Sequence, residues 1–174
     1  MQNKTVVIVN GKPRSGKDTF CNFVSEYCEQ KEQYCDVWST IDFEKEILED
    51  VVNRPYNPTS SIDREFLSEL KRLLNLYYDI TFRDFKNLLE FYDGTFLIHT
   101  REWSEILKFE DYCRDNDIKF IKVFVTRQKE QHFNNKSDAL CDEEKNLYDV
   151  IIENNGTLED LKRDAEQFCE SRLL

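Results

Sequence analysis

Two glycines and a lysine near the N-terminus have the spacing of a loop that binds phosphate groups. Gly11, Gly16 and Lys17 follow the pattern G-x-x-x-x-G-K. Glycines allow backbone angles that other residues avoid, so successive N–H groups can point inward around an anion. The lysine, which we also expect to act in catalysis, adds a positive charge for the outer phosphates of a nucleotide. The predicted nucleotide-binding residues are Gly11, Lys12, Pro13, Arg14, Ser15, Gly16, Lys17, Asp18 and Thr19.

The two residues after the lysine differ from the usual form of this loop. The usual motif has Ser or Thr directly after the lysine as a Mg²⁺ ligand, whereas here Asp18 takes that position and the first hydroxyl belongs to Thr19. A carboxylate is also a hard oxygen ligand, and it is favourable in the first turn of a helix. Asp18 and Thr19 are therefore the predicted Mg²⁺ ligands.

The segments on both sides of the loop favour a strand before it and a helix after it. Residues 6–9 form a continuous β-branched run, which is typical of a strand buried on both faces. After the loop, apolar side chains recur at helical spacing, at Phe20, Phe23, Val24, Tyr27 and Cys28. A chance turn with two glycines and a lysine is the alternative, but the chain has only four glycines, and strand, loop and helix stand in the order that the motif requires.

Four further segments are predicted strands, and helical segments separate most of them. They are residues 35–41, 95–100, 119–126 and 149–153. Strands that alternate with helices predict an α/β fold with a parallel sheet, helices on both faces, and ligands at the carboxyl ends of the strands. We therefore expect a five-stranded parallel sheet.

Residues from about 43 to 92 interrupt this alternation because they are predicted to be helical. One helix ends at the breaker run 54–58, a second begins after Ser60 with Asp63 as a weak capping box, and Thr81 with Asp84 suggests a further cap. The second helix carries an apolar stripe of Ile62, Phe66, Leu67, Leu70, Leu73, Leu74 and Tyr77.

The last predicted helix begins after Thr157, which with Asp160 forms a second capping pattern. Its expected buried face consists of Leu158, Leu161, Ala165, Phe168 and Cys169.

Charged side chains follow several of the predicted strands. Arg101 and Arg127 stand at such ends, where a guanidinium can hold phosphate oxygens and supply the positive charge that phosphoryl transfer needs. Both are candidate catalytic residues. Asp42 is a third candidate, which could orient an acceptor hydroxyl or hold a Mg²⁺-bound water, or could simply cap the next helix. Arg64, within the helical insertion, is either a substrate-binding residue or a solvated helix position.

The segment from about 127 to 146 is polar and nearly free of periodicity. It suits a lid that closes over the site and excludes water, and a solvated loop without a role is the alternative. Within it, Asn135-Lys136-Ser137-Asp138 matches the N-K-x-D motif of guanine-binding proteins. We interpret that match as chance, because no apolar strand precedes it. His99, inside a predicted strand, is interpreted as a hydrogen-bonded interior residue rather than a catalyst.

Length and composition indicate a single globular domain over residues 1–174, with 40% apolar and 13% aromatic residues. A net charge of -11 without any basic tract argues against a nucleic-acid partner. No signal-peptide pattern or membrane-length apolar run is present, so we expect a cytoplasmic protein without a membrane partner. The six cysteines form no C-x-x-C pair, which predicts reduced thiols. Nothing in the sequence indicates an oligomeric state.

The loop GKPRSGKDT resembles those of bacteriophage deoxynucleoside monophosphate kinases and of animal-type phosphomevalonate kinases. Over essentially the whole chain, the order of parts is similar to that of the P-loop nucleoside monophosphate kinase superfamily. SIDREFLSELK falls where the acceptor-binding helices of those kinases lie, HTREWSEI follows the third strand, and YDVIIENNGTLEDL resembles their last strand, turn and helix. The resemblance implies a three-layer α/β/α P-loop NTPase fold with a helical acceptor-binding insertion.

Carried over residue by residue, the resemblance implies roles for the candidates. Lys17 would contact the β- and γ-phosphates, Asp18 and Thr19 would serve phosphate and Mg²⁺, and Arg64 and Arg101 would hold the acceptor phosphate. Arg127 would be a lid arginine at the transferring group, although the lids of these kinases often carry several arginines and this one adds only lysines.

The expected function is ATP- and Mg²⁺-dependent transfer of a phosphoryl group to a small phosphorylated acceptor, in the first place a (deoxy)nucleoside monophosphate. The expected partners are thus a nucleotide donor and that acceptor. Two alternatives remain: a kinase for another small acceptor such as phosphomevalonate, and a nucleotide-binding regulator without acceptor kinase activity.

Overall fold

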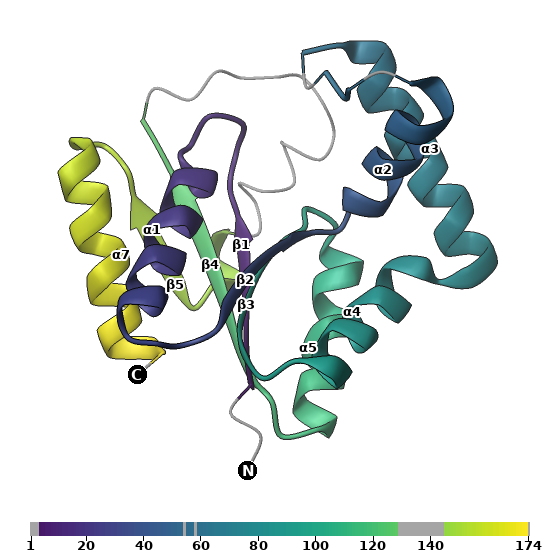
Figure 1. The fold of residues 1–174 in the computed structure, drawn as a ribbon. Helices are drawn as coiled ribbons and strands as arrows, with labels where there is room; N and C mark the ends of the chain where they lie inside the picture. The colour runs from purple at the N-terminus through teal and green to yellow at the C-terminus, as the bar shows by residue number, and fades with distance from the viewer. Residues whose placement is uncertain (1–3, 54, 58, 129–144, 174) are drawn as a thin grey trace. The chain divides into compact units, whose positions relative to one another are not determined.

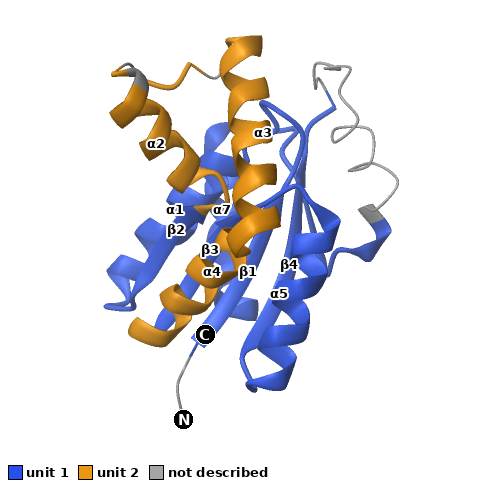
Figure 2. Ribbon diagram, turned by 90° about the vertical axis from the view of Figure 1, so that its right-hand side faces the viewer, with its two compact units in different colours: residues 1–38, 93–174 blue, residues 39–92 orange. Residues whose placement is uncertain are grey.

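The computed structural model describes residues 4–53, 55–57, 59–128 and 145–173. The chain divides into two compact units, of which unit 1 comprises residues 1–38 and 93–174 and unit 2 comprises residues 39–92 (Figure 2). Unit 2 is therefore one continuous insertion in the sequence of unit 1.

Unit 1 is built on a parallel sheet of five strands in the order β2-β3-β1-β4-β5. The strands are β1 (Lys4–Asn10), β2 (Cys35–Ser39), β3 (Gly94–His99), β4 (Lys119–Thr126) and β5 (Val150–Glu153). The central strand β1 pairs in parallel with β3 and β4, so that Val7 lies opposite both Leu97 and Ile121. The predicted α/β fold with a five-stranded parallel sheet is confirmed, although β2 ends at Ser39, two residues before its expected end.

Helices cover both faces of this sheet. The helices α1 (Lys17–Gln30) and α7 (Leu158–Arg172) lie side by side on one face, and α5 (Trp103–Asp115) lies on the other (Figure 1). A short 3₁₀ helix, η1 (Lys145–Leu147), precedes β5. Among the helices of the described ranges, none is both long enough and apolar enough to cross a lipid bilayer.

The core between the sheet and the pair α1 and α7 holds most of the predicted apolar residues. Val7 and Val9 of β1 belong to the same buried cluster as Phe20 and Phe168, whose ring centroids are 5.6 Å apart. Thr157 and Asp160 form the predicted capping box of α7. Leu158 was expected in the buried face but is 58% exposed. As the first residue of α7 it precedes the turns that pack on the core, which begin at Leu161.

The described residues of unit 2 form three helices, namely α2 (Asp42–Val52), α3 (Ser61–Tyr78) and α4 (Ile80–Phe91). The predicted cap of α3 is confirmed, because the Asp63 backbone N–H donates to Ser60 Oγ at 3.2 Å. The predicted cap at Thr81 is wrong. Asp79, with φ of 50°, separates α3 from α4, so Thr81 falls inside the first turn of α4, and its N–H donates to Asn75 Oδ1 at 3.0 Å.

The apolar stripe predicted on α3 is only partly buried. Leu67 is 3% exposed, whereas Ile62 is 73% and Tyr77 is 80% exposed. The buried line of α3 instead runs through Asp63, Leu67 and Lys71. Two of these are polar residues with specific partners: Asp63 accepts from the Asn57 N–H at 3.0 Å, and Lys71 Nζ donates to Thr40 Oγ1 at 3.0 Å.

Candidate phosphate-binding site

The loop between β1 and α1 has the backbone that the two glycines predict. A Cβ atom on Gly11 would lie 2.3 Å from the carbonyl oxygen of Val125 and 2.7 Å from Ser15 Oγ. Gly16 is the N-cap of α1 with φ of 95°, and a Cβ atom there would lie 2.3 Å from Asn154 Nδ2. The loop therefore passes so close to its neighbours that a side chain at either glycine would collide with them.

The start of α1 presents a set of hydrogen-bond donors. Within the part of the chain that the structure describes, the backbone N–H groups of residues 16–19 donate to no acceptor, as expected for the first turn of a helix. Ser15 Oγ is fully buried and likewise has no hydrogen-bond partner among the described residues. A buried hydroxyl is rarely left in this state, so Ser15 Oγ together with the N–H groups at the start of α1 makes a candidate anion site.

Two other N–H groups of the loop are used internally. The Gly11 N–H donates to Asn10 Oδ1 at 2.7 Å, and the Ser15 N–H donates to the carbonyl oxygen of Lys12 at 3.1 Å. These bonds shape the loop, and the free donors lie after them, at its junction with α1.

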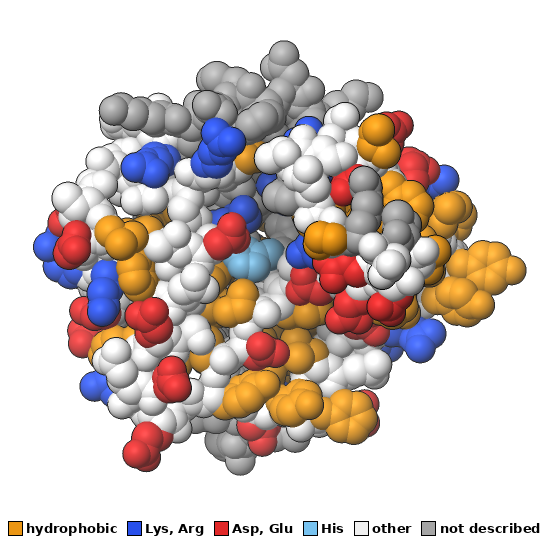
Figure 3. Space-filling view, turned by 45° about the horizontal axis from the view of Figure 1, so that its top comes forward, with side chains coloured by type: hydrophobic (Ala, Val, Ile, Leu, Met, Phe, Trp, Pro, Cys, Tyr) orange, Lys and Arg blue, Asp and Glu red, His pale blue; other side chains and the backbone are white. Residues whose placement is uncertain are grey.

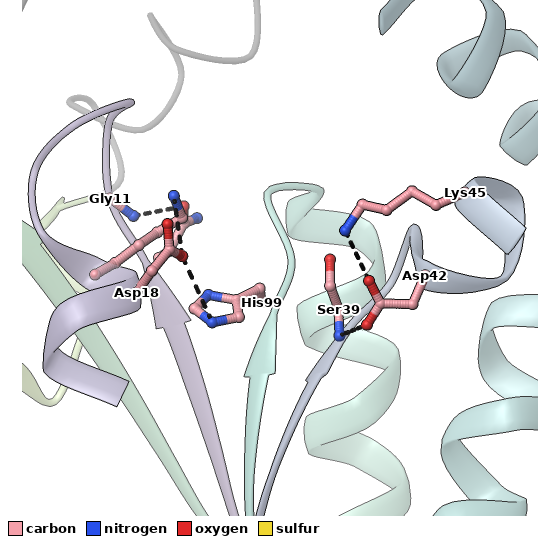
Figure 4. A network of polar contacts seen from close by, with 8 residues as sticks. Gly11, Asp18, Ser39, Asp42, Lys45 and His99 are labelled. Atoms are coloured by element: carbon pink, nitrogen blue, oxygen red, sulfur yellow. Dashed lines mark hydrogen bonds and ion pairs between the residues drawn. The ribbon is translucent and has the colours of Figure 1, made fainter. Parts of the chain in front are cut away.

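Asp18 lies between two basic side chains at the start of α1. Its Oδ1 is 3.7 Å from Lys17 Nζ and 3.8 Å from His99 Nε2 at the end of β3 (Figure 4). The Asp18 side chain is 78% exposed, whereas those of Lys17 and His99 are 17% and 15% exposed. His99 thus lies beside the loop, although the sequence alone favoured an interior role.

Two oxygen-bearing side chains at this point are of the kind that Mg²⁺ prefers. Asp18 offers an accessible carboxylate, and Thr19 offers a half-buried hydroxyl on the next residue. Within the described ranges, no group of three or more His, Cys, Asp or Glu side chains is arranged to hold a metal ion. Since Mg²⁺ commonly binds through one or two protein oxygens together with substrate phosphates, the donor set suits that mode.

Cys21 follows the loop in the second turn of α1 but has no nucleophilic character. Burial, with a smaller contribution from the charge of Asp18, raises the pKa of its thiol far above the ordinary value. The thiol therefore stays neutral near pH 7.

Two buried asparagines hold the loop, and sequence reasoning missed both. Asn10, which is 2% exposed, accepts from Gly11 as described above. Asn154, which is 7% exposed, donates from Nδ2 to the carbonyl oxygen of Ser15 at 2.8 Å. One signal was available: Asn10 is the last residue of β1 and Asn154 directly follows β5, and in this fold polar side chains at the carboxyl ends of strands meet a ligand.

The arginines predicted at the strand ends lie in unit 1. Arg101 follows β3, Arg127 follows β4, and both are exposed. These positions share the carboxyl edge of the sheet with the loop after β1. Near Arg127, the N–H of Gln128 donates to Asn155 Oδ1 at 2.8 Å, which fixes the backbone at the end of β4 to the turn after β5.

Asp42 and Arg64, the remaining candidates, belong to unit 2. Asp42 accepts from the Ser39 N–H and pairs with Lys45 Nζ, both at 2.7 Å (Figure 4). It is the first residue of α2 rather than its N-cap, which is Ile41. Arg64 lies exposed in the first turn of α3.

Most of the predicted lid, from about 127 to 146, lies outside the described residues, and so does the tetrapeptide at 135–138.

Solved structures with a similar fold cover nearly the whole chain. A tunicamycin resistance protein of Deinococcus radiodurans is 11% identical, with a TM-score of 0.53 over 97% of this chain and 95% of that chain. A protein named APE1195 is 13% identical, with a TM-score of 0.51 over 100% and 99%. A candidate kinase of Chloroflexus aurantiacus is 11% identical, with a TM-score of 0.50 over 98% of both chains. At such identities these likenesses show the fold alone.

No curated protein sequence matches the chain. The sequence model of one protein family matches residues 79–167. This range begins with the last residue before α4 and does not include the phosphate loop. Since this range spans just over half of the 174 residues, the chain belongs to the family described as "Protein of unknown function (DUF4080)".

Proposed function

We propose that this protein is an ATP- and Mg²⁺-dependent phosphotransferase that acts on a small phosphorylated acceptor, in the first place a (deoxy)nucleoside monophosphate. The observation that carries the proposal is the loop between β1 and α1. The loop and the start of α1 carry the free N–H groups of residues 16–19, the buried hydroxyl of Ser15 and the charge of Lys17. Such a set of donors suits the phosphates of a nucleoside triphosphate.

The loop residues would act by position and charge. The N–H groups at the start of α1 would hold phosphate oxygens, and Lys17 would leave its 3.7 Å contact with Asp18 to bind the outer phosphates. Asp18 and Thr19 would hold Mg²⁺, which when bound neutralises charge on the transferring group. The protein would take little part in covalent chemistry, because phosphoryl transfer depends mainly on the alignment of donor and acceptor and on stabilisation of the charge in the transition state.

The other candidates would bind the acceptor and the transferring group. Arg101 would hold the acceptor phosphate and Arg127 the transferring group, because both follow strands at the carboxyl edge of the sheet. In unit 2, Arg64 would contribute to the acceptor phosphate. Asp42 would orient the acceptor, although its carboxylate is already bound to Ser39 and Lys45. Among the similar structures, the candidate kinase of Chloroflexus aurantiacus agrees with a transferase of this class.

The deciding experiment incubates the protein with MgATP and a panel of nucleoside and deoxynucleoside monophosphates, with phosphomevalonate in parallel, and measures ADP release. We expect turnover that depends on one acceptor class. Lys17→Ala should lower kcat/KM by about a hundredfold or more, because it removes positive charge from the transferring phosphate.

Lys162→Ala is the matched control. Lys162 is an exposed lysine on α7 whose Nζ lies 6.0 Å from the ring centroid of Phe23, so its loss should leave turnover unchanged. Full activity of the Lys17→Ala variant would refute the mechanism. Tight ATP binding without turnover of any acceptor would instead favour a nucleotide-binding regulator.

A further inference from the structure

The phenol of Tyr148 is linked to the first residue of the phosphate loop through one buried side chain. Asn10 ends β1 and accepts from the Gly11 N–H at 2.7 Å through Oδ1. Its other terminal atom, Nδ2, donates to Tyr148 Oη at 2.8 Å. Asn10 and Tyr148 are 2% and 8% exposed, so solvent competes little for either bond.

The donor and the acceptor of each of these hydrogen bonds follow from the chemistry of the groups. The Gly11 N–H group can only donate, so the atom of Asn10 that faces it must be the carbonyl oxygen. The amide nitrogen of Asn10 then necessarily faces Tyr148, and the phenol oxygen acts as the acceptor. A flipped amide would place two donors against each other at Gly11, so the side chain has one acceptable orientation.

Tyr148 is itself held on several sides. Its ring centroid lies 5.2 Å from that of Phe124 and 6.0 Å from that of Trp103. The next residue, Asp149, is tied to β4 because its N–H donates to the carbonyl oxygen of Lys122 at 2.9 Å and its Oδ2 accepts from the Lys122 N–H at 2.7 Å. The Tyr148 side chain is therefore held in place, and the hydrogen bond from Asn10 joins the end of β1 to it.

The hydrogen bonds that hold the start of the loop matter because there is little free space around Gly11. The Cα of Gly11 is so close to Val125 and Ser15 that a methyl group there would lie 2.3 Å and 2.7 Å from their nearest oxygen atoms. A small shift of Gly11 would therefore move Ser15, whose buried hydroxyl belongs to the set of phosphate donors. The position of these donors depends on how firmly the start of the loop is held.

We propose that Tyr148 is a positioning residue for the phosphate loop, acting through Asn10 on the backbone of Gly11. Its effect on nucleotide affinity rests on the proposed function, but its effect on the loop does not. Tyr148 would touch neither the nucleotide nor the acceptor.

The first test uses the protein without any ligand. Hydrogen–deuterium exchange is measured on peptides that cover residues 10–20, for the wild type and for Tyr148→Phe, which keeps the ring and removes only the hydroxyl. We expect exchange in these peptides to become about threefold to tenfold faster, the range given by loss of one buried neutral hydrogen bond. Tyr27→Phe is the control, because it removes another phenol hydrogen bond of unit 1, to Glu170 Oε1 at 3.0 Å.

The second test measures the affinity for MgATP and for pyrophosphate at a temperature well below the unfolding transition. Tyr148→Phe should raise both dissociation constants by about threefold to tenfold and leave far-UV circular dichroism unchanged. Asn10→Ala should have a similar effect, and the double variant should be no worse than Asn10→Ala alone, because both changes break one chain of bonds.

The outcomes separate the two proposals. If Tyr148→Phe has the same hydrogen exchange and the same affinity as Tyr27→Phe, the proposed role of Tyr148 is wrong. A fall in the Tm of Tyr148→Phe without faster exchange at residues 10–20 would also contradict that role. Additive effects in the double variant would equally count against it. A wild type that binds neither MgATP nor pyrophosphate would refute the proposed function, while the exchange of the ligand-free loop would still decide the role of Tyr148.

Discussion

At Gly11, the addition of a side chain has a clear structural cost. A Cβ atom there would meet the backbone oxygen of Val125 at 2.3 Å, and that oxygen belongs to the sheet and cannot move aside easily. Gly11→Ala is therefore expected to lower the free energy of unfolding by about 1–3 kcal/mol, the usual cost of overpacking. Urea unfolding followed by circular dichroism measures this loss.

Gly156→Ala is the matched control for that prediction. Its Cβ atom would lie 2.6 Å from Asp160 Oδ2, which is the end of a side chain rather than backbone. Moving this carboxylate aside would weaken the bonds that it accepts from Thr157, but it would not displace a strand, so a loss smaller than that of Gly11→Ala is expected. Equal losses for the two variants would contradict the argument from the rigid carbonyl of Val125.

At the residue scale, the sequence predicted the loop and missed the side chains that hold it. Gly11 and Lys17 stand in one short pattern, so their spacing alone identifies them. Asn10 and Tyr148 are 138 positions apart in the sequence, and Asn154 and Ser15 are 139 positions apart. No local pattern carries these pairs, because only the register of β1, β4 and β5 brings them together.

At the scale of elements, the first turn of α7 makes a prediction about pH. Backbone and side-chain hydrogen bonds from Thr157, with a further bond from Arg163, lower the pKa of Asp160. A carboxylate with a lowered pKa stabilises the fold above the pKa that it has in the unfolded chain, and this stability is lost as the pH falls through its pKa in the folded chain. Asp160→Asn should therefore reduce stability at pH 7 and make little difference in strong acid, when urea unfolding is compared between these conditions.

Glu159→Gln serves as the control for that comparison. Glu159 lies in the same turn, but its side chain makes no hydrogen bond or ion pair to any described residue. Its replacement should change the free energy of unfolding much less at either pH. A pH dependence as large as that of Asp160→Asn would mean that the helix dipole, rather than the bonds to Thr157 and Arg163, is responsible.

The helices show where pattern reasoning succeeds and where it fails. The caps at Ser60 and Thr157 were predictable because cap and partner lie three residues apart. The start of α4 was not, because the N–H of Thr81 is satisfied by Asn75 from the preceding helix. The buried face of α3 was missed for a related reason: Asp63 and Lys71 are buried with specific polar partners, which hydrophobic periodicity cannot reveal.

For the molecule as a whole, the net charge of -11 contrasts with the phosphate-binding role proposed for the loop. On the face drawn in Figure 3, acidic and basic side chains are interspersed with hydrophobic ones. The proposed binding of a nucleotide would therefore depend on short-range contacts at the loop, because the net negative charge of the protein repels a triphosphate.

Ligand binding should raise the stability of the whole chain. MgATP at a free concentration of about a hundred times its Kd is expected to add about 2.7 kcal/mol to the free energy of unfolding. For a chain of 174 residues this corresponds to a rise of about 5–11 °C in Tm, measured by differential scanning calorimetry. At the same concentration Lys17→Ala should lose most of this rise, and an undiminished rise would show that MgATP binds elsewhere.

Unit 2 has a further consequence that follows from where it joins the sheet. Residues 39–92 leave at the end of β2 and return just before β3, and these two strands are neighbours. A connection between parallel neighbours needs only about a dozen residues, usually one helix. The length of the insertion can therefore change while the pairing of β2 with β3 is kept.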